Sequence, residues 1–322
     1  MDARRKQLRQ RVFELQSSSV NRCFEPTGTC TNPAIRAHSI QNSRMLERLC
    51  ENGPVIMPKL QTNVRQSEDV FKPVGRQSAT TFTGLCGEHD RRIFEPIDRL
   101  PIDLQDEEHL FLLAYRSVLR EVHAVQTGTV KNQLAYQAKV DLGLIPGEVP
   151  TGDGERSLWL FMNAYEFDLY KRMFDEAYQA SDYQAVHHVT FFEDGFEPTI
   201  AVSALFSLDE IQVGDDVARI ALNVFPLDTG VACVFSFLSS EMNHISAFLK
   251  PFQLASGEAL LQLLSVRILQ SCENFVLSPR FWNGLAQSKR QAIAGLFLTT
   301  ILRDGQASQN SDLMLFKRVT EG

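Results

Sequence analysis

The sequence has 322 residues, of which 44% are hydrophobic and 22% are charged, proportions that are ordinary for a folded globular protein. This composition excludes collagen-like, disulfide-scaffold and disordered chains, and the length suits two domains or one large domain with a small appendage. No apolar run reaches the roughly 18 residues needed to cross a bilayer, and the first twenty residues lack the apolar stretch of a signal peptide, so we expect a cytoplasmic protein that does not associate with membranes.

The formal net charge of -7 is unevenly distributed along the chain. Residues 1–99 contain 16 Lys and Arg against 11 Asp and Glu, a net charge of +5, whereas the remainder carries a net charge of −12. A basic segment attached to an acidic body is typical of a protein whose first part alone approaches DNA or RNA. The alternative is a solvated basic helix, with an acidic body that contacts a protein partner. The pattern does not determine an oligomeric state.

The first third of the chain combines one helical pattern with a long irregular stretch. Residues 3–16 repeat apolar side chains at helical spacing among several arginines, which predicts a short basic amphipathic helix. Residues 51–80 are rich in Pro, Gly, Gln, Ser and Thr and show little periodicity. They predict a long loop with a short strand near residues 55–57.

Long helices and then strands are predicted for the rest of the chain. Residues 106–126 place apolar side chains every three or four positions after an acidic start, and a second helical pattern spans about 155–180. Four short β-rich runs between residues 185 and 238 are separated by turn residues, which predicts an antiparallel meander of about four strands. Residues 240–302 return to helical patterns.

Four residues stand at zinc-ligand spacing. Six cysteines in a cytoplasmic chain are not expected to form disulfides, because the cytosol keeps thiols reduced. Zinc prefers four tetrahedral nitrogen and sulfur ligands, commonly supplied as two close pairs. Cys23 and Cys30 flank a turn that contains Pro and Gly, while Cys86 and His89 open a predicted helix. We therefore predict one structural zinc ion bound by these four residues.

The alternative is that these four residues are unrelated to one another. Against it, both pairs stand in polar, turn-rich sequence that does not suit buried apolar cysteines. The remaining cysteines lie in apolar or helical patterns and are predicted to be structural: Cys50, Cys233 and Cys272.

The order of the ligand pairs leads to a fold prediction. Two ligands at the start of a helix, together with two from an earlier knuckle, follow the plan of a treble-clef zinc finger. The predicted domains are a zinc-binding treble-clef module over residues 1–100 and a body over residues 101–322. The predicted fold class is α+β, with the finger followed by two long helices, an antiparallel sheet and C-terminal helices. No glycine-rich phosphate loop is present, which argues against a nucleotide-hydrolysing protein.

A histidine between the two ligand pairs gives a resemblance to a known family. His38 is centred in the segment A-H-S-I, and the arrangement resembles the His-Me finger (HNH) nucleases, in which a zinc knuckle precedes a strand that bears the catalytic histidine. The resemblance implies that His38 is the general base and that Asp90 binds Mg²⁺ or Mn²⁺. It further places Arg91 and Arg92 on the phosphate backbone. The chain is also similar to bacterial proteins with an A-H-S-I segment and a later T-F-x-G-x-C-x-x-H-D segment, which bring no assigned activity.

The resemblance covers about 75 residues and departs from the family pattern in three ways. The acidic residue often found before the catalytic histidine is Ala37 here, and the spacing from His38 to Cys86 is long. No single asparagine takes the central position of the motif, although three are available: Asn42, Asn52 and Asn63. His38 has alternative roles, as a fifth candidate zinc ligand or as a brace that hydrogen-bonds the finger.

Two functions therefore stay open at this point. The first is a zinc-stabilised nucleic-acid binder that acts as a metal-dependent nuclease, with His38 as base and Asp90 as metal ligand. The second is a non-catalytic, zinc-braced sensing or protein-interaction module, in which His38 is buried or bound to zinc.

Overall fold

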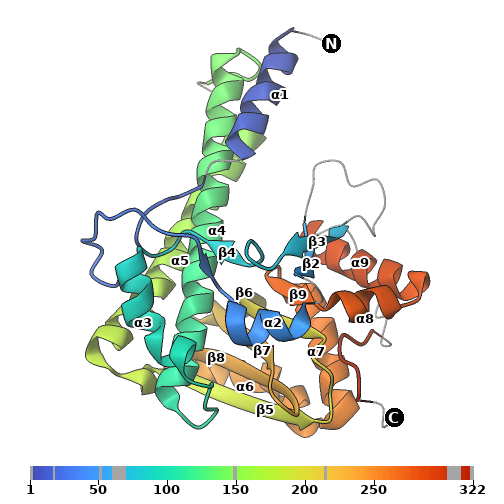
Figure 1. Ribbon diagram of the computed structural model, residues 1–322. Helices are drawn as coiled ribbons and strands as arrows, with labels where there is room; N and C mark the ends of the chain where they lie inside the picture. The colour runs from blue at the N-terminus through green and yellow to red at the C-terminus, as the bar shows by residue number, and fades with distance from the viewer. Residues whose placement is uncertain are drawn as a thin grey trace. The chain divides into compact units, whose positions relative to one another are not determined.

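The computed structural model describes residues 3–16, 19–50, 53–59, 70–147, 151–213, 216–302 and 313–319 (Figure 1). The chain divides into two compact units, each of which draws on several segments. Unit 1 comprises Met1–Ala37, Phe82–Ile93 and Val118–Asp182. Unit 2 comprises His38–Thr81, Phe94–Ser117 and Tyr183–Gly322. The mixture of helices and antiparallel strands confirms the predicted α+β class. The division at residue 100 stays a prediction of domain organisation.

Helices dominate unit 1. They are α1 (Ala3–Gln16), α3 (Gly87–Arg99), α4 (Glu107–Asp141) and α5 (Gly152–Ala180). Unit 1 contains all of α1 and α5, but only the start of α3, up to Ile93, and the part of α4 from Val118 onward. The C-terminal half of α4 runs antiparallel to α5, since Lys139 Nζ lies 2.6 Å from Asp153 Oδ1 at one end. Further along, Thr129 Oγ1 donates a hydrogen bond of 3.0 Å to the carbonyl of Leu160.

Helix α4 continues 15 residues beyond the predicted end at Gln126. The sequence Thr127-Gly128-Thr129 has low helix propensity and favours a stop. Packing against α5 overrides that preference, because the Thr129 hydroxyl is bonded within the helix pair and its side chain is buried. The predicted helices over residues 3–16 and 155–180 are confirmed as α1 and α5.

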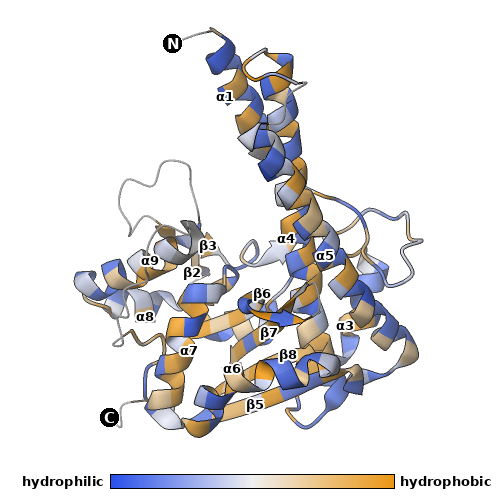
Figure 2. Cartoon of the chain, turned by 180° about the vertical axis from the view of Figure 1, so that it is seen from behind, coloured by the Kyte–Doolittle hydropathy of each residue, from blue (hydrophilic) through white to orange (hydrophobic). Residues whose placement is uncertain are grey.

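Unit 2 is built around a seven-stranded antiparallel sheet with the order β3-β2-β9-β6-β7-β8-β5. The strands are β2 (Pro54–Pro58), β3 (Phe71–Gly75), β5 (Val186–Asp194), β6 (Ile200–Val213), β7 (Asp216–Pro226), β8 (Gly230–Leu238) and β9 (Phe275–Leu277). Hydrophobic residues predominate along β6, β7 and β8 (Figure 2). The sheet is paired in register, for example Leu222 with Phe235, and both of these side chains are fully buried.

The four strands predicted between residues 185 and 238 are confirmed, but their order corrects the predicted meander. β5 pairs with β8 along its full length, from Val186 opposite Leu238 to Asp194 opposite Gly230. Only β6, β7 and β8 follow one another as neighbours. A simple meander would place β5 beside β6. The apolar patterns of the strands are alike, so the sequence does not select the partner of β5.

The stretch predicted as a loop over residues 51–80 also needs correction. The strand expected near residues 55–57 is β2, and it pairs with a second strand, β3, that was not predicted. Pro73 weakened the strand pattern, but β3 lies at the edge of the sheet, where a missing backbone N–H is tolerated. Residues 60–69 lie outside the described residues.

The C-terminal helical region contains the short strand β9, which was also missed. The helices are α6 (Met242–Leu254), α7 (Gly257–Ser271), α8 (Pro279–Gly284) and α9 (Gln287–Leu302). Their apolar faces join the sheet in one core, in which Leu264, Ile268 and Phe297 are at most 1% exposed. Cys233 and Cys272 are buried in this core as predicted, and Cys50 is half-buried.

Several short elements complete the fold. They are β1 (Ala37–His38), β4 (Thr81–Phe82), the π-helix η1 (Asn42–Leu46), α2 (Glu47–Leu49) and the 3-10 helices η3 (Tyr183–Ala185) and η4 (Ser239–Glu241), with β1 and β4 paired in a two-stranded sheet. Within the described ranges, none of the helices is both long and apolar enough to cross a membrane.

Candidate metal centre

The four predicted zinc ligands converge in unit 1. Nδ1 of His89 lies 3.4 Å from Sγ of Cys23 and 3.3 Å from Sγ of Cys86. Sγ of Cys30 lies 3.9 Å from Sγ of Cys86, and all four ligand atoms are within 4.8 Å of one another. The cluster is partly shielded from water, because Cys23 and Cys86 are buried and the other two ligands are half-buried.

These distances fit a tetrahedral metal site. Zn–S bonds of about 2.3 Å and Zn–N bonds of about 2.0–2.1 Å give a tetrahedron with edges of about 3.6–3.8 Å, close to the distances between the ligand atoms. Three thiols and one imidazole form a donor set that suits zinc. The four residues singled out in the sequence thus form a cluster that could bind a structural metal ion such as zinc.

Glu25 shapes the turn between the first two ligands. Its carboxylate accepts backbone N–H bonds from Thr27 at 2.9 Å, from Thr29 at 2.7 Å and from Cys30 at 3.0 Å. Gly28, with φ of 69°, adopts the left-handed conformation that the reversal of the chain requires. The carboxylate therefore supplies acceptors for these three amides, beside the backbone bond of 3.0 Å from the amide of Gly28 to the carbonyl of Glu25.

The charge on Glu25 is stabilised by these contacts. Burial of the side chain would raise its pKa, but the Thr27 hydroxyl and the three amides together outweigh burial and lower the pKa of Glu25 to about 2. The Thr27 hydroxyl donates at 2.7 Å. Glu25 is not among the residues predicted from the sequence. In the sequence, the acidic residue is followed within a few positions by Thr, Gly and Thr. In such a pattern a carboxylate accepts hydrogen bonds from the amides of the turn that follows it.

Backbone hydrogen bonds bring the two ligand pairs together. The amide of Phe24 donates to the carbonyl of Gly84 at 2.7 Å, and the amide of Ile35 donates to the carbonyl of Leu85 at 2.8 Å. The amide of Cys86 also donates to Sγ of Cys23 at 3.3 Å. The knuckle is therefore attached directly to the segment that leads into α3.

The thiols differ in how readily they lose a proton. Burial raises the pKa of Cys23 to about 11. Burial acts in the same direction on Cys86, but hydrogen bonds from the backbone of His89 and from the neighbouring thiols outweigh it and lower the pKa of Cys86. Thiolates, not thiols, bind metal, so metal binding at this cluster releases protons.

The second pair of candidate ligands stands at the start of helix α3. Cys86 immediately precedes the helix and His89 lies in its first turn. The amide of Asp90 donates to the carbonyl of Cys86 at 2.9 Å, and the Asp90 side chain is half-buried. Arg91 and Arg92 are exposed. The start of α3 therefore has a candidate metal ligand in its first turn and two exposed guanidinium groups in the next.

His38 lies in unit 2, on strand β1. Its Nδ1 is 2.9 Å from the carbonyl oxygen of Ala79. A carbonyl only accepts hydrogen bonds, so Nδ1 carries the proton and the lone pair of a neutral imidazole is on Nε2. The same bond is what a bracing histidine would make. Asp90 belongs to unit 1, so the pairing of His38 with Asp90 in one centre stays a prediction.

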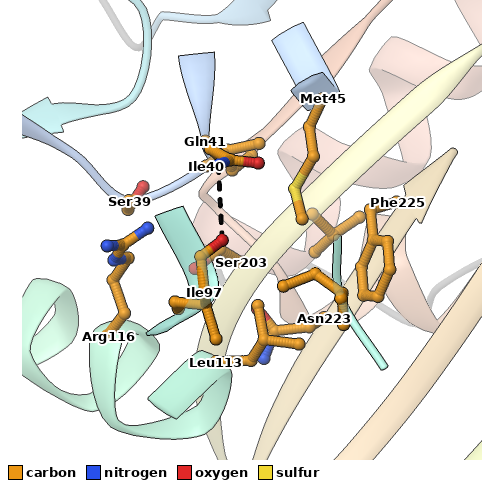
Figure 3. A pocket seen from close by; sticks show the side chains of 12 residues that line it. Ser39, Ile40, Gln41, Met45, Ile97, Leu113, Arg116, Ser203, Asn223 and Phe225 are labelled. Atoms are coloured by element: carbon orange, nitrogen blue, oxygen red, sulfur yellow. Dashed lines mark hydrogen bonds between the residues drawn. The ribbon is translucent and has the colours of Figure 1, made fainter. Parts of the chain in front are cut away.

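A small pocket in unit 2 is lined by apolar and polar side chains that were not predicted as site residues from the sequence (Figure 3). Its volume of about 10 Å³ is that of one water molecule, too small for a substrate. Ser203 and Asn223 line it. The hydroxyls of Ser117 and Ser203 share a hydrogen bond of 2.8 Å, and Ser117 Oγ donates to Asn223 Oδ1 at 3.2 Å. Their signal was the presence of Ser and Asn inside otherwise apolar strands. They hold α4 against the sheet.

Comparison of the chain with protein-family models, with curated proteins and with solved structures gave no match. The resemblance to His-Me finger nucleases is therefore carried by the motif residues alone, and function is inferred from the residues of this chain.

Proposed function

We propose that the protein is a zinc-stabilised nucleic-acid-binding protein. The observation that carries this proposal is the position of Arg91 and Arg92, both exposed on α3 two and three residues after the metal-ligand candidate His89. Guanidinium groups bind phosphate oxygens through paired hydrogen bonds, and a rigid helix start holds them in a defined direction. The metal cluster fixes that helix start relative to the knuckle.

The role assigned to zinc here is structural. Cys23, Cys30, Cys86 and His89 would occupy all four tetrahedral positions and leave none open for water or substrate. When bound, the ion would supply folding free energy by clamping the knuckle to α3.

The first helix adds positive charge to the same unit. Its five basic side chains are exposed, and it contains a single acidic residue, Glu14. The basic residues are Arg4, Arg5, Lys6, Arg9 and Arg11. Exposed basic groups attract phosphates without regard to base sequence, and each phosphate contact steepens the salt dependence of binding.

Binding of labelled DNA and RNA, single- and double-stranded, at several salt concentrations tests this proposal. We expect Arg91→Ala/Arg92→Ala to weaken binding roughly tenfold and to reduce the salt dependence by about two phosphate contacts. Arg156→Ala is the matched control, because Arg156 is an exposed arginine of the same unit on α5. Equal losses in the variant and the control, or no binding at low salt, would contradict the proposal.

A second, finer function is favoured by the hydrogen bond of His38. We propose that His38 acts as the general base of phosphodiester hydrolysis, because the bond from Nδ1 to the carbonyl of Ala79 fixes the neutral tautomer in which Nε2 carries the lone pair. Asp90 is the proposed ligand of a Mg²⁺ or Mn²⁺ ion. When bound, such an ion stabilises negative charge on the phosphate.

Incubation of the purified protein with DNA and RNA in the presence of Mg²⁺ or Mn²⁺ tests this function. We expect His38→Ala to abolish cleavage while nucleic-acid binding and zinc content stay unchanged. His244→Ala is the matched control, since His244 is exposed on α6. Cleavage that is unaffected by His38→Ala would end the catalytic assignment. Absence of any nucleic-acid binding would instead favour the zinc-braced protein-interaction module.

A further inference from the structure

Helix α5 has a second apolar face that points to solvent. Its inner face packs in unit 1, where Phe167, Tyr170 and Phe174 are at most 6% exposed. On the other side, six large apolar side chains are 47–63% exposed. They are Leu158, Trp159, Phe161, Met162, Tyr165 and Met173. A single helix buries only one stripe against its own protein, so this outer face of α5 indicates a second packing partner.

The apolar surface extends onto α4. A groove of about 430 Å³ lies between the helices, where Val130 of α4 faces Phe161 and Tyr165 of α5 beside polar side chains. The polar lining residues include Arg22, Gln126, Gln133 and Asp168. Val130 and Leu134, one helical turn apart, are 41% and 45% exposed. Eight large side chains that are about half exposed present roughly 100 Å² each, or ~800 Å² in total. That area matches the roughly 800 Å² per partner of a standard stable interface.

The spacing of residues along the outer face is that of a coiled-coil seam. Six positions follow one another at intervals of three, four, three, four and three residues: Glu155, Leu158, Met162, Tyr165, Leu169 and Arg172. Alternating intervals of three and four are the a and d positions of a heptad repeat, which pack against another helix. The occupant that this seam fits is therefore an α-helix.

We propose that this helix is α5 of a second copy of the chain, packed antiparallel in a two-fold symmetric dimer. The seam is symmetric about its midpoint, so an antiparallel copy places Leu158 opposite Leu169 and Met162 opposite Tyr165. The charged ends then complement each other, because Glu155 of each copy faces Arg172 of the other. A parallel pair would place Glu155 against Glu155 and Arg172 against Arg172. Within its own helix Arg172 forms an ion pair of 3.1 Å with Asp168.

Sedimentation velocity of the full-length zinc-loaded protein over a range of concentrations tests the dimer. We expect the wild-type chain to dimerise and Leu158→Glu/Met162→Glu to be monomeric at the same concentrations. Both side chains are exposed, so the variant should keep its circular dichroism spectrum and melting temperature. Leu254→Glu, at an exposed apolar residue that ends α6, is the matched control and should stay dimeric.

Charge reversal tests the antiparallel arrangement. Glu155→Arg or Arg172→Glu alone places like charges at both ends of the interface and should weaken dimerisation roughly five- to tenfold, whereas the double reversal should restore it. The proposal is overturned if the wild-type chain stays monomeric, or if the dimer persists in Leu158→Glu/Met162→Glu. The partner of this face would then be a different protein or a lipid surface. A double reversal that fails to restore dimerisation overturns the antiparallel pairing.

Discussion

Nδ1 of His89 lies 3.4 Å from Sγ of Cys23, although 66 residues separate them in the sequence. Between them the chain leaves unit 1 at Ala37 and returns to it at Phe82. Closing a loop of that length costs conformational entropy, and a metal ion that joins its two ends offsets the cost when it binds. The free energy of metal binding at this cluster is therefore part of the folding free energy of unit 1.

Removal of one ligand should uncouple these segments. We expect Cys86→Ser to lower zinc affinity more than ~100-fold and to reduce the free energy of unfolding of unit 1 by about 3–5 kcal/mol. Metal content by mass spectrometry and urea denaturation measure the two effects. Cys50→Ser is the control, because Cys50 is half-buried in unit 2 and its thiol donates to the carbonyl of Glu47. One zinc per chain retained in Cys86→Ser would disprove the ligand assignment.

The knuckle should depend on Glu25 almost as strongly as on its own ligands. Glu25→Ala leaves the amides of Thr27, Thr29 and Cys30 without their acceptor, so we expect a loss of about 3 kcal/mol in unfolding free energy and roughly tenfold weaker zinc binding. Glu25→Gln should lose less, since an amide oxygen still accepts hydrogen bonds. Denaturation and competition with a zinc chelator measure these effects.

Glu176→Ala supplies the comparison for Glu25, since Glu176 is an exposed acidic residue of the same unit on α5. It should leave stability within about 0.5 kcal/mol of the wild type. If Glu25→Ala behaves like Glu176→Ala, the carboxylate does not hold the knuckle.

The metal cluster could be predicted from the sequence because its signal is local. Cys23 and Cys30 flank a recognisable turn, and Cys86 and His89 open a helix, so ligand type and spacing stand in two short segments. Glu25 was not predicted, because a carboxylate that accepts hydrogen bonds from the amides of its own turn has no fixed sequence motif. Its role becomes visible only through the distances to Thr27, Thr29 and Cys30.

The sheet was harder to predict because its pairing is not local. β9 has only three residues, Phe275–Leu277, and is recruited between β2 and β6 by long-range contacts that leave no periodicity in the sequence. β5 was recognised as a strand, yet its pairing with β8 depends on which neighbour buries the apolar face of Val186. For β5, local propensity identified the strand and packing decided its partner, whereas for β9 packing decided both the type of the element and its partners.

His188 should make the stability of unit 2 sensitive to acid. Its Nδ1 lies 2.8 Å from the hydroxyl of Ser236 on β8, and within the described residues its buried Nε2 has no hydrogen-bond partner. Burial, with a smaller contribution from the neighbouring His187, lowers the pKa of His188 to about 4. A proton on Nε2 would place an unpaired charge inside the protein, so the folded state keeps the imidazole neutral.

The sign of the effect follows from the two pKa values of His188. In the unfolded chain the imidazole has its ordinary pKa of about 6.5, so between pH 6.5 and 4 the unfolded state binds a proton that the folded state does not. The contribution of His188 to stability is complete above pH 6.5 and is lost as the pH falls. At pH 5 the loss is about 2 kcal/mol relative to pH 7.5.

His188→Gln retains a hydrogen-bonding side chain that cannot titrate, so its unfolding free energy should fall by about 2 kcal/mol less over this interval. His244→Gln, at an exposed histidine, is the control and should lose as much unfolding free energy between pH 7.5 and 5 as the wild type. An equal loss in His188→Gln would show that burial does not lower the pKa of His188.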